Sequence, residues 1–270
     1  MLLNFRKAPP TRPLFVLGSQ RSGTTMIADV LAKSPDCEVF LGEKRRLVFE
    51  GASRLVPIQT IAKLVSRSRR RVAVFKPNND LQYANVFLDS DPNARIIWVY
   101  RDYRDAINSA VKRWGTAHRD IMMGIARGRT MHPGQAAIAE GVSDALRTLL
   151  QGVCHDDLTP EEGAALLWYA RNSLYFDRHL DRNERVLVAN YEDSVRSPAD
   201  CFSRVFEFAG ATFKAQYVRD VFGSSIGKQQ QPVLGKAVET LCQAMMALLG
   251  ARYDARFSAA DQNRLAVGLR

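Results

Sequence analysis

P-L-F-V-L-G-S-Q-R-S-G-T-T-M-I-A-D-V-L, residues 13–31, is the stretch that decides the fold. It opens with an apolar run ending in glycine, residues 14–18, which is typical of a buried parallel strand. It continues with apolar residues at helical spacing over 24–33. The loop between them, G-S-Q-R-S-G-T-T, nearly matches the phosphate-binding pattern G-x-x-x-x-G-K-S/T. Thr24 stands where that pattern has lysine and Arg21 supplies a cation three residues earlier, so the loop predicts an anion site with displaced positive charge.

Alternating strands and helices continue along the rest of the chain. Apolar and β-branched runs predict three further strands, at residues 71–77, 94–102 and 185–193. Helices are expected after the third strand, to about Trp114, and after the fourth, through residues 198–210. Because strands separated by single helices form parallel sheets, we expect an α/β protein with a central parallel sheet and helices on both faces.

Residues 115–165 fit this alternation least, and we expect them to form a helical insertion or lid over the ligand edge of the sheet. His118 and His132 fall in this segment, and we expect both to be exposed. Residues 164–178 predict an amphipathic helix whose large apolar side chains belong to the core. The 270 residues are expected to form one domain, residues 1–270.

Composition limits the function classes. The formal net charge of +10 indicates an anionic ligand or partner. The basic run R-S-R-R-R, residues 67–71, is expected to be a solvated helix end, so we expect no nucleic-acid partner. No secretory leader and no run of about 18 apolar residues are visible, so no membrane span is expected. Four scattered cysteines are expected to be reduced thiols of a cytoplasmic protein: Cys37, Cys154, Cys201 and Cys242.

The loop after the first strand is expected to hold an anion. In open α/β sheets, ligands bind beyond the carboxyl ends of the strands. A glycine-bounded loop that enters a helix also directs backbone N–H groups and the positive end of the helix dipole at that edge. Ser22, Gly23, Thr24 and Thr25 are therefore candidate phosphate-binding residues, with Arg21 beside them.

A second anion site is expected at the end of the strand 94–102. ATP-cleaving P-loop enzymes place a Mg²⁺-binding carboxylate at such a strand end, but here the residue is Arg101. Ser109 lies two helical turns further, on roughly the same helix face as Arg101. The alternative for Arg101 is a surface ion pair with Asp105. Together with the first loop, these residues predict two separate phosphate sites and no metal.

Four segments in this order resemble the sulfotransferases that use 3'-phosphoadenosine 5'-phosphosulfate (PAPS). They are Q-R-S-G-T-T, R-D-Y-R-D-A-I-N-S, V-A-N-Y-E-D-S-V-R-S-P, and S-S-I-G-K-Q-Q-Q-P at residues 224–232. The resemblance implies a P-loop NTPase-like sulfotransferase fold, with the first segment at the 5'-phosphosulfate and the second at the 3'-phosphate. Tyr191 is then implied to lie near the adenine, and 224–232 to be a loop that closes over the nucleotide.

The spacing is most similar to the protein-tyrosine sulfotransferases. Residues 34–46 are similar to their P-D-x-x-x-G-E-E-T-R segment, which implies Glu43 as the catalytic base, with Glu50 in reserve. The resemblance also implies that Lys76, Arg21 and Ser224 assist the transfer. Lys44-Arg45 replaces the family's E-T, and Lys76-Pro77-Asn78 replaces the K-x-H of the small-molecule branch. The implied cofactor contacts are Arg21, Ser22, Gly23, Thr24, Thr25, Arg101, Ser109, Arg113, Tyr191, Ser224, Ser225, Ile226, Gly227 and Lys228.

The expected function is transfer of a sulfuryl group from PAPS to an acceptor hydroxyl, which releases 3'-phosphoadenosine 5'-phosphate (PAP). Peptidyl tyrosine, carbohydrate and small molecules stay open as acceptors, and so does the oligomeric state, a homodimer included. Two other functions stay open. One is a P-loop kinase that uses Mg²⁺ and ATP, and the other is a nucleotide-binding protein without catalytic activity.

Overall fold

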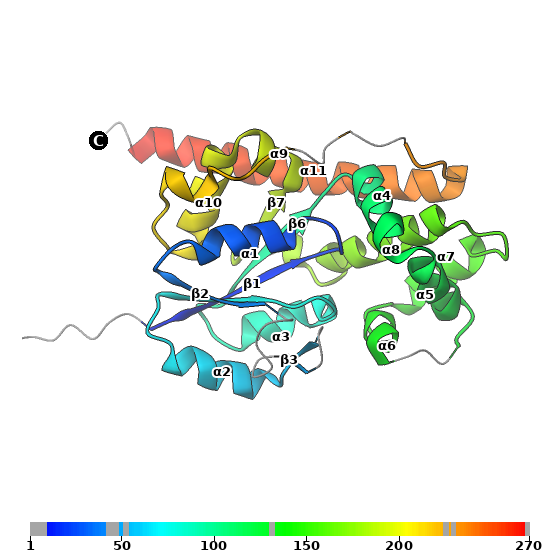
Figure 1. The fold of residues 1–270 in the computed structure, drawn as a ribbon, viewed down its shortest axis with the longest axis horizontal. Helices are drawn as coiled ribbons and strands as arrows, with labels where there is room; N and C mark the ends of the chain where they lie inside the picture. Colours follow the sequence, from blue (N-terminus) through cyan, green and yellow to red (C-terminus); the bar gives the residue numbers. More distant parts are fainter. Residues whose placement is uncertain are drawn as a thin grey trace, which may run out of the picture.

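A five-stranded parallel sheet forms the centre of the computed structural model, which describes residues 10–41, 49–50, 54–129, 133–223, 227 and 231–267 (Figure 1). The strand order is β2-β5-β1-β6-β7. The strands are β1 (Arg12–Gly18), β2 (Cys37–Leu41), β5 (Val72–Lys76), β6 (Arg95–Tyr100) and β7 (Val186–Asn190). The predicted parallel sheet is confirmed, and β1, the strand of the opening stretch, lies at its centre.

Helices cover both faces of the sheet, as the alternation of side chains along β1 requires. Leu14 and Val16 face one hydrophobic cluster, and Phe15 and Leu17 face the other. The first cluster is covered by α1 (Thr24–Ala32) and α10 (Pro198–Ala209). The second is covered by α2 (Ile58–Arg67), α3 (Ala84–Asp89), α4 (Tyr103–Trp114), α8 (Pro160–Asp177) and α11 (Lys236–Val267).

One strand of the sheet, β2, was not predicted. It pairs only with β5, so it is an edge strand of five residues. A short edge strand has one solvated side, and here Glu38 interrupts its apolar pattern and accepts a hydrogen bond from the Ser68 hydroxyl (2.9 Å). A small antiparallel pair, β3 (Phe49–Glu50) with β4 (Arg54–Leu55), was not predicted either.

The described parts of residues 115–165 consist of helices joined by short turns. They comprise α5 (Ala117–Ala126), α6 (Pro133–Ala139), α7 (Asp144–Val153) and the start of α8. Figure 1 shows α5, α6 and α7 beyond the end of β1 that leads into α1. Ile121, Met122 and Ile125 of α5 belong to the larger core cluster, so α5 is built into the main core.

The predicted exposure of His118 is wrong, while His132 lies outside the described residues. His118 is only 8% exposed, and its ring lies 4.9 Å from that of Trp114. Burial, and secondly the positive charge of Arg171, lower the pKa of His118 to about 4. The imidazole is therefore neutral at physiological pH.

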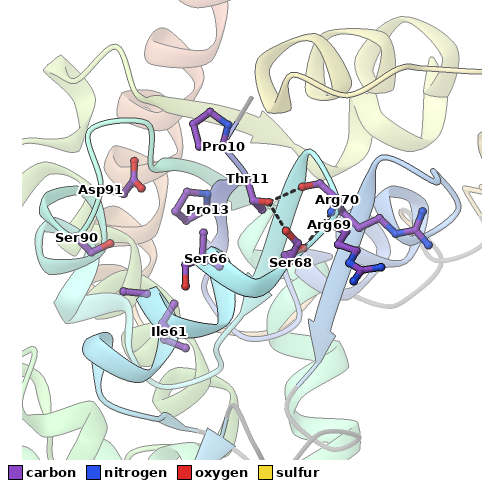
Figure 2. A pocket seen from close by; sticks show the side chains of 12 residues that line it. Pro10, Thr11, Pro13, Ile61, Ser66, Ser68, Arg69, Arg70, Ser90 and Asp91 are labelled. Carbon is purple, nitrogen blue, oxygen red and sulfur yellow. Dashed lines mark hydrogen bonds between the residues drawn. The ribbon is translucent and has the colours of Figure 1, made fainter. Parts of the chain in front are cut away.

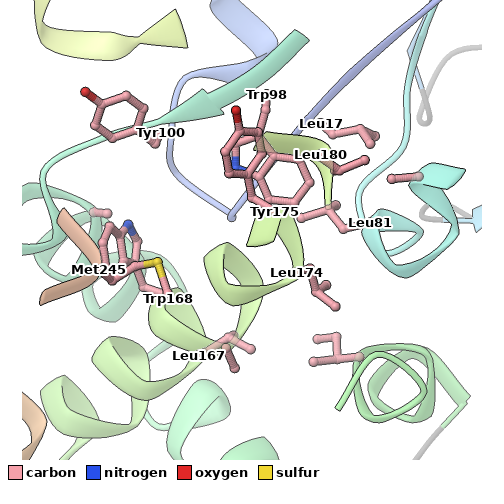
Figure 3. Close-up of a cluster of buried hydrophobic side chains, with 14 of the residues drawn as sticks. Leu17, Leu81, Trp98, Tyr100, Leu167, Trp168, Leu174, Tyr175, Leu180 and Met245 are labelled. Atoms are coloured by element: carbon pink, nitrogen blue, oxygen red, sulfur yellow. The ribbon is translucent and has the colours of Figure 1, made fainter. Parts of the chain in front are cut away.

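Helix α8 is the buried support of the larger cluster (Figure 3). It begins with a capping box, in which the Thr159 hydroxyl accepts from the Glu162 N–H and the Glu162 carboxylate accepts from the Thr159 N–H. Its large side chains pack against the sheet and α4, with ring centroids 5.5 Å apart for Trp98 and Tyr175 and 5.8 Å apart for Tyr103 and Trp168. The prediction that this helix contributes to the core is confirmed.

The basic run 67–71 lies at the opposite end of the sheet from the loop before α1. It begins at Arg67, the last residue of α2, and borders a cavity of about 550 Å³ (Figure 2). The Thr11 hydroxyl donates to the carbonyls of Ser68 (3.1 Å) and Arg70 (2.6 Å), which fixes the run against β1. Its arginines are exposed, which agrees with the expected solvated helix end.

All four cysteines are unpaired, and burial raises the pKa of Cys37 and Cys242 to about 12. Such thiols are poor nucleophiles at neutral pH. Among the helices that the structure describes, none combines the length and apolar character needed to cross a membrane.

We expect His118→Phe to flatten the pH dependence of the free energy of unfolding between about pH 6.5 and 4. Because the folded pKa lies below the unfolded one, the unfolded chain binds the proton first, and stability is lost as pH falls through this window. The wild type should lose up to about 3 kcal/mol there through this residue. Urea unfolding at several pH values measures this effect, with exposed His155→Asn as the control. Equal pH dependence in wild type and His118→Phe would contradict the burial of a neutral imidazole.

Candidate active site

A cleft of about 500 Å³ lies at the carboxyl end of the sheet, where the loop after β1 enters α1. Ligands of open α/β sheets bind at this edge. The cleft is lined by Gln20, Arg21, Gly23, Thr24, Thr25, Met26, Lys76, Arg101, Ser109, Arg113, Trp114 and Tyr191.

The loop backbone takes two left-handed conformations to reach the helix. Arg21 has φ 66° and Gly23 has φ 91°, values that favour glycine and are strained for arginine. A Cβ on Gly23 would also overlap the ring of Tyr191, so the residue must be glycine. Helix α1 begins at Thr24, and the backbone N–H groups of its first turn have no acceptor within the helix. The helix therefore offers N–H donors and a positive dipole end to an anion in the cleft.

Three guanidinium groups meet in the cleft, from Arg21, Arg101 and Arg113. Burial first, and then the charges of Arg101 and Arg113, lower the pKa of Arg21. The Nε of Arg21 donates to the Ser109 hydroxyl (2.8 Å), which joins the loop to α4. The three positively charged guanidinium groups repel one another, so an anion bound between them would relieve this repulsion.

Arg101 is the most buried of the three and is held on several sides. Its side chain lies 3.5 Å from the Asp105 carboxylate and 3.8 Å from the Glu192 carboxylate. Its Cζ lies 4.4 Å from the ring centroid of Tyr191, and its Nη1 donates to the Arg21 carbonyl (3.4 Å). The alternative ion pair with Asp105 therefore exists, but it orients a guanidinium that also lines the cleft.

Lys76 ends strand β5, which pairs directly with β1, so its ammonium lines the same cleft as the loop. Its Nζ donates to the side-chain oxygen of Asn78 (2.6 Å). The next residue, Asn79, accepts a hydrogen bond from the Gln20 amide (3.4 Å). The turn after β5 thus contacts both the lysine and the loop before α1.

Most of the predicted site residues that the structure describes lie together in this cleft. Ser22 does not, because it is fully buried and its N–H donates to the Ser19 carbonyl (3.2 Å). Gly227 lies in a smaller neighbouring cavity of about 230 Å³, where its N–H donates to Asp105 (3.2 Å). The brought-together set is Arg21, Gly23, Thr24, Thr25, Lys76, Arg101, Ser109, Arg113 and Tyr191.

The remaining predictions fall outside the described residues. Glu50 lies in β3, where the structure describes its backbone but not its side chain. The others are Glu43, Ser224, Ser225, Ile226 and Lys228.

Sequence reasoning missed Trp114, whose ring lies 5.8 Å from the Cζ of Arg21 and forms an aromatic wall of the cleft. A signal was present, since the tryptophan directly follows Arg113. It also missed Glu192 as the second carboxylate beside Arg101. Burial raises the pKa of Glu192, while hydrogen bonds from its own backbone N–H and that of Asp102, together with the Arg101 charge, oppose the rise. No pattern in the sequence pairs residues 91 positions apart in this way.

Comparison with known proteins places the chain among enzymes of one class. A family model described as the sulfotransferase domain matches residues 11–229. The sulfotransferase domain of the olefin synthase of Synechococcus PCC 7002 is 17% identical, with TM-score 0.50 over 89% of this chain and 96% of that one. The sulfotransferase domain of the curacin biosynthetic pathway is 13% identical, with TM-score 0.53 over 89% and 99%. At these identities the structures show the shared fold. No curated protein matches the chain significantly.

We expect Gly23→Ala to weaken the binding of adenosine 3',5'-bisphosphate (PAP) by about 10- to 100-fold, because a strained backbone costs about 1–3 kcal/mol. The added methyl group must displace the ring of Tyr191 and the loop with it. Calorimetric titration with PAP measures the loss. Gly152→Ala in α7, where a Cβ meets open space, is the matched control and should bind as the wild type does. An unchanged affinity of Gly23→Ala for PAP would show that the loop does not take part in anion binding.

Proposed function

We propose that this chain, which belongs to the sulfotransferase domain family and is a PAPS-dependent sulfotransferase, transfers the sulfuryl group to an acceptor hydroxyl by in-line displacement. One observation carries this proposal, the meeting of three guanidinium groups and the α1 N-terminus in a cleft that also holds the Lys76 ammonium. PAPS has two separated anionic groups, the 3'-phosphate and the 5'-phosphosulfate. The 5'-phosphosulfate carries the sulfuryl group that goes to the acceptor. The cleft offers positive charge for each of the two anionic groups.

The chain's own residues divide between the two anionic groups in this proposal. The first turn of α1, with Arg21, would hold the 5'-phosphosulfate, since backbone N–H groups and a cation converge there. Arg101, which follows β6, and Ser109 and Arg113 of α4 would hold the 3'-phosphate. The rings of Tyr191 and Trp114 offer aromatic faces for the adenine.

The transfer step needs a cation at the reacting group and a base at the acceptor. The acceptor oxygen attacks sulfur while the S–O bond to the 5'-phosphate breaks, and PAP leaves with that oxygen. Lys76 would stabilise the negative charge on the sulfuryl and leaving oxygens, as a preorganised cation does best. Glu43 is proposed to be the carboxylate that accepts the proton of the acceptor, and Ser224 to assist the transfer with its hydroxyl.

The acceptor is proposed to be a hydroxyl group of peptidyl tyrosine, a carbohydrate or a small molecule. A phenol with a pKa near ~10, or an alcohol above it, keeps its proton at neutral pH, which is why a base is required. We also propose a cytoplasmic enzyme, on the argument that its four cysteines are unpaired.

The cofactor assignment is tested by calorimetric titration with PAP and with ATP, each with and without Mg²⁺. We expect micromolar PAP binding that is indifferent to Mg²⁺, because guanidinium groups provide the charge that Mg²⁺ supplies in kinases. Ser109→Ala should weaken PAP binding about 10-fold through loss of a hydrogen bond to a charged phosphate. Ser203→Ala on α10 is the control. Tight Mg²⁺-dependent ATP binding with no response to PAP would instead establish a kinase.

Catalytic roles are tested with PAPS and a panel of phenol, peptide, sugar and alcohol acceptors. Glu43→Gln should lower kcat by about 100-fold or more while leaving the Kd of PAP within about 3-fold, because a general base contributes to the chemical step. Mass spectrometry of the sulfated acceptor measures the rate. PAP binding without any sulfated product in the wild type would indicate a nucleotide-binding protein without catalytic activity. If Glu43→Gln keeps the kcat of the wild type, another group is the general base.

A further inference from the structure

The turn after β5 connects Lys76 to the buried helix α8 through two hydrogen bonds. The Lys76 ammonium donates to the side-chain oxygen of Asn78 (2.6 Å). The backbone carbonyl of the same asparagine accepts from Nη2 of Arg171 (2.7 Å). Asn78 is thus held by its backbone on one side and holds the lysine with its side chain on the other.

Arg171 is an unusual residue for its position. It lies on α8 among the large apolar side chains of the core and is 2% exposed. Its Nε and Nη1 find no hydrogen-bond partner among the described residues. Burial lowers its pKa to about 10, and the Asp80 carboxylate opposes this shift. A buried cation with unsatisfied donors is costly, and well-packed apolar side chains replace such groups without loss of stability in other proteins. Stability of the core therefore does not account for an arginine here.

The charge opposite Arg171 belongs to the same turn. Asp80 follows Asn78 by two residues and is itself buried. It accepts hydrogen bonds from Nε of Arg54 (3.1 Å) and from the N–H of Leu55 (2.8 Å). The turn is therefore fixed at Asn78 by a direct bond from α8 and at Asp80 by bonds from β4. A turn fixed at Asn78 and Asp80 places the Asn78 side chain reproducibly, and with it the Lys76 ammonium that donates to this side chain.

We propose that Asn78 and Arg171 are positioning residues for Lys76 in sulfuryl transfer, an inference that rests on the proposed function. Arg171 fixes the turn through the Asn78 carbonyl, and the Asn78 amide oxygen orients the Lys76 ammonium in the cleft. An amide oxygen suits this task because it is neutral. It directs the N–H groups of the lysine without cancelling the positive charge that the reacting group needs.

The position of Asn78 also separates this chain from the K-x-H pattern, where the third residue is a base. An amide does not take up a proton at neutral pH, so Asn78 cannot act as the base for the acceptor. The same place in the turn instead serves the lysine two residues before it.

A readout independent of activity comes from competitive labelling of lysines with trace acetic anhydride, followed by mass spectrometry. In the wild type without cofactor, the bond to Asn78 should protect the Lys76 amine relative to the exposed Lys63. Asn78→Ala and Arg171→Met should both raise the labelling of Lys76 by at least about 3-fold relative to Lys63, as loss of one hydrogen bond of about 1 kcal/mol predicts. Exposed Asn93→Ala is the control. Unchanged labelling in both variants would overturn the proposal.

Activity supplies the second readout through a double-mutant comparison. Asn78→Ala should lower kcat by about 10- to 100-fold with the Kd of PAP within about 3-fold, because it misplaces a group that acts in the transition state. In a Lys76→Met background the same change should have no further effect on kcat. Multiplying effects would show a general structural role and overturn the proposal.

Arg171→Met tests the inner half of the connection. It should keep the melting temperature of the wild type, since methionine fills the site without a buried charge. Its effect on kcat should not add to that of Asn78→Ala. If labelling changes as expected while the wild type sulfates no acceptor, the proposed function fails and the positioning of Lys76 stands.

Discussion

Mutual repulsion of the guanidinium groups in the cleft is the constraint on which the rest of the site depends. Three arginines brought to one edge of a sheet destabilise the fold unless something opposes their charge. Asp105 and Glu192 stand behind Arg101, and the Ser109 hydroxyl accepts from Arg21. Asp105 and Glu192 do not line the cleft, whereas Ser109 does, so the guanidinium groups keep their positive charge directed at the cleft. The fold thereby keeps a strongly positive surface in place before any anion binds.

The loop backbone is shaped so that an anion can approach the N-terminus of α1. An anion at the α1 N-terminus needs the backbone close to it, and a side chain at Gly23 would fill that space and strike Tyr191. Tyr191, the residue directly after β7, in turn lies against Arg101, so its ring contacts both the loop glycine and the guanidinium. The loop glycine therefore packs against a residue some 170 positions later in the chain.

How much could be predicted from the sequence depended on how local the signal was. The strand-loop-helix at residues 13–31, and the arginine and serine eight apart at residues 101 and 109, are local patterns, and both lie in the cleft as expected. Strand β2 was missed because a short edge strand carries little periodicity. His118 was misplaced because its burial is set by α8, far away in sequence. The bond between Asn78 and Arg171 spans 93 residues, and no spacing rule relates such partners.

The distribution of charge differs between the core, which is stabilised by apolar packing, and the cleft, which gathers positive charge. Around Trp98 and Tyr175 the core is apolar and its aromatic rings pack together, and a buried polar atom without a hydrogen-bond partner costs stability there. Arg171 stands in that core with two unused donor groups, yet its one strong bond reaches the turn that holds Lys76. A residue that costs stability in the core and contacts the site is best explained by the site. The same logic applies to Arg21, whose strained backbone and lowered pKa are accepted where the loop meets the cleft. Strain and buried charge in this molecule thus coincide at the edge of the sheet where the chemistry is proposed, and the helices on its two faces supply the stability that offsets them.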